Sequence, residues 1–276
     1  MNLELAIEAA VGRRPRRLVP LAGGCVGEVY RAEFEVGDPL VAKIDQASSA
    51  TLEIEGAMLV DLAPYLPVPA VVHSAPELLL MEWMSGSSSF TSPAEQHAAE
   101  LLAALHGVTA EEFGYERGTL IGGLYQPNPR TTTWLEFFAE RRLIYMAREA
   151  HSHGTVDRVC AFAADLAEFL AEPSAPSLLH GDVWSGNVLA DNGRITAFLD
   201  PAIYFGHPEV ELAFITMFST FGDRFFEAYR ALSRIDPGFM SERRHAYNLY
   251  PNLVHARLFG GSYVRSVENI LARFGC

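Results

Sequence analysis

The order of apolar and polar positions divides the chain into a first part rich in strands and a second part rich in helices. Before residue 85, short apolar or alternating runs predict strands, and after residue 89 apolar residues recur at the three- and four-residue steps of amphipathic helices. The expected strands are 17–22, 28–34, 40–44, 70–73 and 78–84. Asn2 and either Ser48 or Ser49 are expected to cap two early helices, and the later helices are expected at 92–106, 134–149 and 156–170.

Turn residues set the boundaries between these elements. A Ser/Gly stretch at 85–89 reads as a linker, and Asp191-Asn192-Gly193 predicts a hairpin turn within the segment 187–200. The expected fold class is therefore α+β with two lobes. Residues 1–84 would form a small antiparallel sheet with one main helix, and residues 85–276 a larger, mainly helical lobe, with a hinge at about 82–89.

Composition narrows the class of protein. The chain has 276 residues, of which 49% are hydrophobic, which is enough to bury a full core and excludes a disordered or fibrous protein. Asp and Glu outnumber Lys and Arg by 34 to 21, so a nucleic-acid partner is not expected. The three cysteines are too few for a disulfide framework, and no apolar stretch has the length of a membrane span. We expect a cytoplasmic monomer or homodimer without a membrane partner.

The segment Leu179–Val188, with the sequence LHGDVWSGNV, carries the strongest chemical signal. Asp182 follows His180 by two residues and precedes Asn187 by five, which is the spacing of the kinase catalytic loop. In this spacing a carboxylate can accept the proton of an attacking hydroxyl, while a neutral amide one turn later holds Mg²⁺. The hairpin that follows should return Asp200 beside Asn187, so that both residues hold the metal on the nucleotide phosphates.

The N-terminal part supplies the expected phosphate-binding residues. Gly23 and Gly24 lie between two predicted strands, where backbone N–H groups can approach phosphate oxygens. Lys43, in the pattern Val-Ala-x-Lys on a strand, is expected to neutralise phosphate charge. A helix residue should form an ion pair with it: Glu55 is the first choice and Glu53 the alternative, since only one of the two can point at the strand.

Two further expectations concern the nucleotide site. The last strand of the small lobe ends in Glu82, Trp83 and Met84, whose backbone would contact adenine as the hinge of a kinase does. Cys25 lies in the Gly-rich loop beside the phosphates. As a free thiol it could form an intermolecular disulfide that makes activity redox-sensitive, or it could be a small residue that fits the turn.

Together these motifs resemble the fructosamine kinase (ketosamine-3-kinase) family, a branch of the protein-kinase-like fold that also holds aminoglycoside and choline kinases. The likeness extends over nearly the whole chain. The Trp-Ser-Gly-Asn form of the loop, and Asp-Pro-Ala in place of Asp-Phe-Gly, are specific to this family among small-molecule kinases. The residues that carry the resemblance are Gly23-Gly24-Cys25, Lys43, Gln126-Pro127-Asn128, Trp134-Leu135-Glu136-Phe137-Phe138, Arg141-Arg142-Leu143, Leu179–Val188 and DPAIYFGHPEVELA at 200–213.

The resemblance implies ATP-dependent phosphorylation of the sugar 3-hydroxyl of a fructosamine or related ketosamine, free or protein-bound, with ATP and Mg²⁺ as cofactors. Spacing alone stops at a phosphotransferase that acts on a hydroxyl. The alternatives are a kinase of the same fold for an aminoglycoside, choline or homoserine, and an inactive nucleotide-binding regulatory module. One departure from the family pattern is Glu28 after the Gly-rich loop, since an acidic residue beside phosphates is unfavourable unless it points away.

Five residues around the catalytic loop are expected to bind substrate or support the site. Trp184 could stack on a sugar face or a cationic amine, a role that the resemblance supports. His207 and Glu209 are expected to border the acceptor pocket. His180 should anchor the loop by packing and hydrogen bonding, and Glu211 should begin a helix and bond back to the loop.

Overall fold

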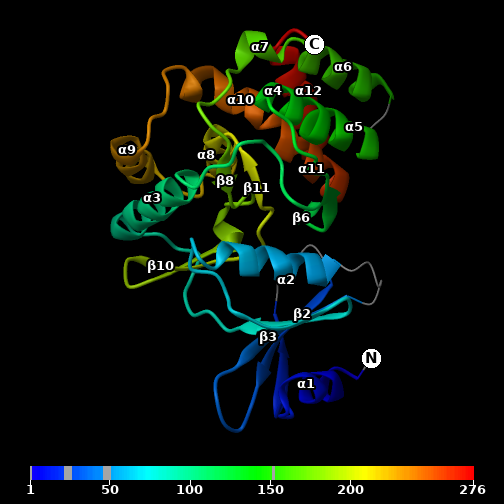
Figure 1. The fold of residues 1–276 in the computed structure, drawn as a ribbon, viewed down its shortest axis with the longest axis vertical. Helices are drawn as coiled ribbons and strands as arrows, with labels where there is room; N and C mark the ends of the chain where they lie inside the picture. Colours follow the sequence, from blue (N-terminus) through cyan, green and yellow to red (C-terminus); the bar gives the residue numbers. More distant parts are fainter. Residues whose placement is uncertain (1, 22–26, 46–50, 151–152) are drawn as a thin grey trace.

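The computed structural model describes residues 2–21, 27–45, 51–150 and 153–276 of the chain. Its first part is a five-stranded sheet with the strand order β1-β2-β3-β5-β4, in which every neighbouring pair is antiparallel. Figure 1 shows this sheet at one end of the molecule and most of the helices at the other. The strands are β1 (Arg17–Pro20), β2 (Glu28–Glu33), β3 (Leu40–Ile44), β4 (Val71–Ala75) and β5 (Leu78–Glu82).

Each face of the sheet is covered by one helix, because the central strands are apolar on both faces. Side chains alternate along β5, so Leu80 packs with Ile7 of the first helix, whereas Leu79 packs with Leu52 of the second. Two separate small cores result, one on each side of the sheet. The two helices are α1 (Leu3–Val11) and α2 (Thr51–Leu62).

The start of α1 confirms the expected cap. The side chain of Asn2 accepts a hydrogen bond from the backbone N–H of Leu5 at 3.2 Å, which satisfies one of the free donors of the first turn. The helix ends at Gly12, whose φ of 73° is in the left-handed region. Ser48 and Ser49, the residues expected to cap α2, lie outside the described residues.

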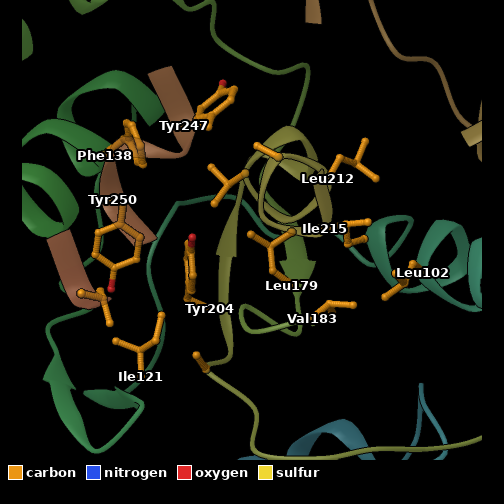
Figure 2. Close-up of a cluster of buried hydrophobic side chains, with 14 of the residues drawn as sticks. Leu102, Ile121, Phe138, Leu179, Val183, Tyr204, Leu212, Ile215, Tyr247 and Tyr250 are labelled. Carbon is orange, nitrogen blue, oxygen red and sulfur yellow. The ribbon is translucent and has the colours of Figure 1, made fainter. Parts of the chain in front are cut away.

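The rest of the chain is mainly helical, as expected, and packs around one large apolar core. Figure 2 shows Leu179 and Val183, which flank the predicted catalytic loop's His180 and Asp182, among the buried side chains of this core. The base of that loop is therefore fixed by packing. The helices are α3 (Ser92–His106), α4 (Trp134–Phe137), α5 (Tyr145–Ala150), α6 (His153–Ala164), α7 (Leu166–Phe169), α8 (Pro208–Met217), α9 (Asp223–Leu232), α10 (Arg244–Tyr247), α11 (Leu249–Phe259) and α12 (Ser262–Arg273).

Three segments have other helical geometry, and one of them falls inside a helix that the sequence predicts as continuous. The expected helix at 134–149 consists of α4, the π-helical segment η1 (Phe138–Ile144) and α5. The wider π turn includes Arg142, which is fully buried. The other two segments are η2 (Ser185–Asn187), a 3₁₀ turn, and η3 (Phe239–Arg243), a second π-helical segment.

The hairpin predicted between 187 and 200 is present as β9 (Val188–Asp191) and β10 (Arg194–Phe198). Asn192 and Gly193 have φ values of 49° and 76°, which is what a two-residue type I′ turn requires. Two other short antiparallel pairs were not predicted. They are β6 (Thr119–Ile121) with β7 (Leu124–Gln126), and β8 (Ser177–Leu179) with β11 (Tyr204–Gly206).

The expected Ser/Gly linker is hydrogen-bonded to the β9–β10 hairpin. Ser87 and Ala190 exchange two backbone hydrogen bonds of 2.9 Å, and Thr196 Oγ1 donates to the backbone oxygen of Ser85 at 2.7 Å. Gly86 has a φ of 147°, and a Cβ there would meet Thr196 and the backbone of Ala190. The linker is thus a short edge segment beside β9.

Within the described residues, no helix combines the length and the apolar character that crossing a lipid bilayer requires.

The type I′ turn generates a prediction about stability. Gly193→Ala should lower the free energy of unfolding by about 1 kcal/mol, because an L-residue is strained at positive φ and the new Cβ would lie 3.2 Å from Pro93. Urea unfolding measures the effect. Gly154→Ala is the control, since the space around Gly154 is open; it should leave stability unchanged or slightly raised. Equal stability of the two variants would contradict the assignment of the turn.

Candidate active site

A cavity of about 620 Å³ lies between the sheet, α2 and the segment that follows β8. It is lined by residues from both halves of the chain. From the first half come Leu21, Val29, Val41, Lys43, Thr51, Glu55, Met58, Pro69, Met81, Glu82, Trp83, Met84, Ser88, Leu120, Gly122 and Gly123. From the second half come Asp182, Trp184, Gly186, Asn187, Leu189, Leu199, Asp200 and Pro201.

Lys43 holds the two halves of this cavity together. Its Nζ lies 2.6 Å from Glu55 Oε1 and 2.5 Å from Asp200 Oδ1. Burial alone would lower the pKa of Lys43, but the charges of Asp200 and Glu55 outweigh it and raise the pKa above its ordinary value. Of the two carboxylates considered as partners, Glu55 forms the ion pair and Glu53 is exposed.

A glycine lets α2 approach the sheet closely enough for this ion pair. A Cβ at Gly56 would lie 2.5 Å from Ser74 Oγ of β4 and 3.2 Å from Leu79 of β5. Because Gly56 has no side chain, α2 can lie directly on these two strands. The neighbouring Glu55 then reaches Lys43 on β3.

The catalytic-loop residues are fixed by short-range bonds. Asn187 Nδ2 donates to the carboxylate of Asp182 at 2.9 Å and to its backbone oxygen at 3.0 Å. These bonds orient Asp182 and leave Asn187 Oδ1 as the acceptor atom of the amide. Burial, and then the nearby charge of Asp200, raise the pKa of Asp182 to about 8. Its carboxylate is therefore a stronger base than an exposed one.

Asp200 follows β10 and is brought to the catalytic loop by the hairpin, as expected. The backbone N–H of Leu199 donates to the backbone oxygen of Asn187 at 2.8 Å. Asp200 has a φ of 50°, an uncommon conformation for a residue other than glycine. The following Ala202 donates its N–H to the backbone oxygen of His180 at 2.7 Å.

Residue 181 of the loop motif must be glycine for a steric reason. Gly181 has a φ of 87°, and a Cβ there would lie only 2.2 Å from the backbone oxygen of Ala202. The loop that carries Asp182 and the segment that carries Asp200 can lie back to back only if residue 181 has no side chain.

Glu211 fixes the loop from behind, in the position that the sequence analysis expects. Its Oε1 accepts from the backbone N–H of Gly181 at 2.6 Å, and its Oε2 lies 2.8 Å from His106 Nε2. Burial alone would raise the pKa of Glu211, but the hydrogen bond and charge of His106 outweigh it and hold the pKa below its usual value. His180 is fully buried and its Nδ1 accepts from the N–H of Asp182 at 3.3 Å, which suits the expected anchoring role.

Trp184 and the three residues at the end of β5 line the cavity as expected. The ring of Trp184 is half-buried and packs against Phe218 with 5.6 Å between ring centroids. Trp83 packs under the guanidinium of Arg31, with Cζ 4.5 Å from the centroid of the ring. Glu82 and Met84 complete the edge of the cavity next to the linker.

His207 and Glu209, the two residues expected to border the acceptor pocket, are not among the residues that line this cavity, and their role there stays a prediction. His207 caps α8, where its Nδ1 accepts from the N–H of Glu209 at 3.1 Å. Burial and the charge of Arg243 lower the pKa of His207 to about 3, so the ring is neutral. Glu209 receives two hydrogen bonds from Arg243, of 2.6 and 2.7 Å. Both side chains are occupied by the start of α8 and its neighbour η3.

Gly23, Gly24 and Cys25 lie outside the described residues, so the expected phosphate contacts and the redox role stay predictions. The described edge of this loop explains the departure at Glu28. Its carboxylate accepts a hydrogen bond from Tyr30 and is not among the residues that line the cavity.

The sequence pattern does not predict the β6–β7 hairpin, which contributes Leu120, Gly122 and Gly123 to the cavity wall. It also does not predict His106 as the partner of Glu211. The only signal for the hairpin is the pair Gly122-Gly123 between two apolar runs of two residues, Leu120-Ile121 and Leu124-Tyr125, and these runs are too short to predict strands.

Comparison with known proteins finds relatives over nearly the whole chain. A model of the fructosamine kinase family matches residues 5–274. A probable ketoamine kinase of Enterococcus faecium is 30% identical, over 94% of this chain and 95% of that protein. A chloroplastic protein-ribulosamine 3-kinase of Arabidopsis thaliana is 30% identical, over 91% of this chain and 80% of that protein.

Solved structures confirm the expected kinase-like fold. A candidate fructosamine-3-kinase from Thermobifida fusca superposes with a TM-score of 0.87 at 28% identity, over 98% of this chain and 97% of the other. An aminoglycoside phosphotransferase in complex with ADP and hygromycin B superposes with a TM-score of 0.68 at 20% identity, over 99% and 96% of the two chains. The second likeness concerns the fold alone.

The environment of Glu211 generates a prediction about pH. Its folded pKa lies below the unfolded value, so its contribution to stability is present above the unfolded pKa and is lost as the pH falls through the folded pKa. Glu211→Gln should lower the free energy of unfolding by about 1–3 kcal/mol at pH 7, and the deficit should shrink below about pH 4.5. Urea unfolding across pH measures this.

The matched control is Glu140→Gln, the same change on an exposed residue, which should alter stability by less than about 0.5 kcal/mol at every pH. A deficit in Glu211→Gln that does not change between pH 7 and pH 4 would mean that the carboxylate charge contributes nothing.

Proposed function

The chain belongs to the fructosamine kinase family, whose members are ATP-dependent phosphotransferases of ketosamines, and we propose that transfer takes place at Asp182, to the 3-hydroxyl of the sugar. One observation carries the proposal. Lys43, Glu55, Asp182, Asn187 and Asp200 come from distant parts of the chain and meet at one cavity. Together they supply a proton acceptor and a phosphate-binding cation, which a phosphotransferase needs.

Asp182 is the proposed proton acceptor. As the acceptor oxygen forms its bond to the terminal phosphorus of ATP, the bond from that phosphorus to the ADP oxygen breaks, and the hydroxyl proton passes to Asp182. The hydrogen bond from Asn187 keeps the carboxylate oriented towards the cavity. Positioning and charge supply most of the acceleration, because phosphoryl transfer needs little covalent work from the protein.

Lys43 is the proposed partner of the phosphates that are not transferred. Glu55 fixes it from α2, so the cation is in place before a nucleotide arrives. Glu82, Trp83 and Met84 mark the adenine end of the cavity, next to the linker. Trp184 follows Asp182 by two residues and also lines the cavity, where its ring offers an aromatic face to the sugar or its amine.

Asn187 and Asp200 fit Mg²⁺. An amide oxygen and a carboxylate are the hard oxygen ligands this ion takes, and Mg²⁺ commonly completes its shell with water and phosphate oxygens. Asn187 Oδ1 is available because Nδ2 makes both bonds to Asp182. When bound, Mg²⁺ neutralises charge on the phosphates.

The acceptor is proposed to be a ketosamine on a free amine or on a protein, and the cytoplasm is proposed as the place of reaction. The names of similar proteins include ketoamine and protein-ribulosamine kinases, which makes fructosamines and ribulosamines the acceptors to test. We also propose that residues 1–84 and 85–276 act as two lobes around the cavity.

A substrate panel tests the acceptor. Wild-type protein with labelled ATP should phosphorylate fructosyl-lysine or ribulosyl-lysine, and NMR of the product should place the phosphate on the 3-oxygen. Aminoglycosides, choline and homoserine are the comparison acceptors. Preference for one of them would overturn the ketosamine assignment, and ATP binding without transfer to any acceptor would indicate a regulatory module.

The role of Asp182 generates a separate prediction. Asp182→Asn should lower kcat by about 10²- to 10⁴-fold, because the amide cannot accept the proton, while the affinity for ATP changes little. Steady-state kinetics and calorimetric ATP titration measure the two effects. Asp157→Asn makes the same change on an exposed helix residue and should leave both unchanged. Normal turnover in Asp182→Asn would show that another group accepts the proton.

A further inference from the structure

Two motifs of the sequence, Gln126-Pro127-Asn128 and Arg141-Arg142-Leu143, take no part in the chemistry above, yet they meet in the fold. Arg142 is fully buried in η1. Its Nη2 donates to Asn128 Oδ1 at 2.6 Å, and its Nη1 donates to the backbone oxygen of Pro127 at 2.9 Å. The guanidinium therefore holds the chain directly after β7 at two points.

The surroundings of Arg142 are neutral and aromatic. Among the described residues, its hydrogen-bond acceptors are three uncharged oxygens. Its Cζ lies 4.0 Å from the ring centroid of Tyr204, 4.6 Å from that of Phe137 and 5.7 Å from that of Tyr250. A buried charge held in this way costs free energy. What a guanidinium supplies here is a planar fork that fixes two oxygens of one loop and stacks on a ring.

The same network reaches the segment that follows Asp200. Gln126 Nε2 donates to the backbone oxygen of Ala202 at 3.2 Å, and Gln126 Oε1 accepts from the hydroxyl of Tyr250 at 2.8 Å. Asn128 Nδ2 donates to Thr119 Oγ1 at 2.8 Å. Thr119 begins β6 and Gln126 ends β7, so both ends of the hairpin are held by buried side-chain bonds.

The hairpin between these ends forms part of the cavity wall through Leu120, Gly122 and Gly123. The chain leading into it is tied to α2, because the hydroxyl of Tyr115 donates to Asp61 Oδ2 at 2.9 Å. In Figure 2, Tyr204 and Tyr250 lie between Phe138, in η1, and Ile121 of β6. The hairpin is thus packed on one side and faces the cavity on another.

The β6–β7 hairpin lies away from the linker at 85–89, and the linker is next to the proposed adenine end of the cavity. In Figure 1, β6 and β10 are on opposite sides of the molecule, and the linker pairs with the β9–β10 hairpin. A Cβ at Gly122 would lie 2.9 Å from Leu258 Cδ1 of α11. The same helix carries His255, whose ring packs on Phe218, the neighbour of Trp184. Gly122 and Trp184 both line the cavity, and contacts with α11 connect the two residues.

We infer that the β6–β7 hairpin forms the acceptor-side wall of the cavity and that Arg142 is a positioning residue, which holds this wall through Pro127 and Asn128. The inference rests on the proposed function, because it concerns the place where the sugar binds. It assigns the two unexplained motifs to the acceptor and not to the nucleotide.

Arg142→Lys tests the inference, since it keeps the charge and loses the fork. The KM for the ketosamine should rise about ten-fold or more, because a small displacement of a positioning wall is costly, while the KM for ATP stays within about two-fold. Calorimetric titration with an ATP analogue should likewise show unchanged nucleotide affinity.

Arg158→Lys is the matched control. Arg158 also lies in the helical part and donates to a carboxylate and to backbone oxygens, those of Glu268 and Cys276, but it does not line the cavity or contact the hairpin. It should lower the melting temperature and leave both KM values unchanged. Should Arg142→Lys fail to fold, Gly122→Ala alters the half-exposed hairpin tip directly and should raise the acceptor KM alone.

The outcomes separate the inference from the proposed function. An equal rise of both KM values, or unchanged KM values with less folded protein, would give Arg142 a structural role only and overturn the inference. If wild-type protein prefers another acceptor of the panel, the ketosamine assignment fails and the same KM comparison is made with that acceptor. If wild-type protein phosphorylates no acceptor at all, the cavity has no acceptor side, and both the proposed function and the inference fail.

Discussion

The ion network of Lys43 with Glu55 and Asp200 is the interaction on which the rest of the structure depends. The three residues come from β3, from α2 and from the turn after β10, so their charges are compensated only when all three elements are in place. A buried cation that loses its partners is strongly destabilising, whereas the complete network is close to neutral in free energy. The chain must therefore bring β3, α2 and the turn after β10 together at the cavity, because otherwise the charge of Lys43 would be buried without a partner.

Much of the fold is readable from local patterns. The strands of the sheet, α1 with its Asn2 cap, α3 and the hairpin turn at Asn192-Gly193 follow from periodicity and from residues with specific backbone preferences. The β8–β11 and β6–β7 pairs do not, because strands of three residues have no measurable period and β8 and β11 are far apart in sequence. The π-helical turn in η1 was missed for a related reason: its apolar pattern is that of an ordinary helix.

The site divides in the same way. That Asp182, Asn187 and Asp200 lie at one cavity could be predicted, because the spacing of a loop and a hairpin determines where their side chains meet. For His207 and Glu209, sequence proximity to Asp200 does not reveal that Arg243, from a later segment, binds one carboxylate and that the start of a helix uses the imidazole. Whether Glu55 or Glu53 faces Lys43 depends on how α2 is rotated about its axis. The close contact of Gly56 with β4 determines that rotation.

The pairing of Ser87 with Ala190 bears on how the molecule can flex. A kinase commonly admits and releases nucleotide by swinging its small lobe about a free connecting strand. In this protein the connecting segment is the linker at 85–89, and it is hydrogen-bonded to β9. The N–H of Phe198, at the end of β10, also donates to the backbone oxygen of Pro67. Any rocking of the sheet must carry the β9–β10 hairpin with it. Asn187 and Asp200, at the two ends of that hairpin, would then travel together with the sheet, so that opening the cleft would keep the spacing between these two side chains.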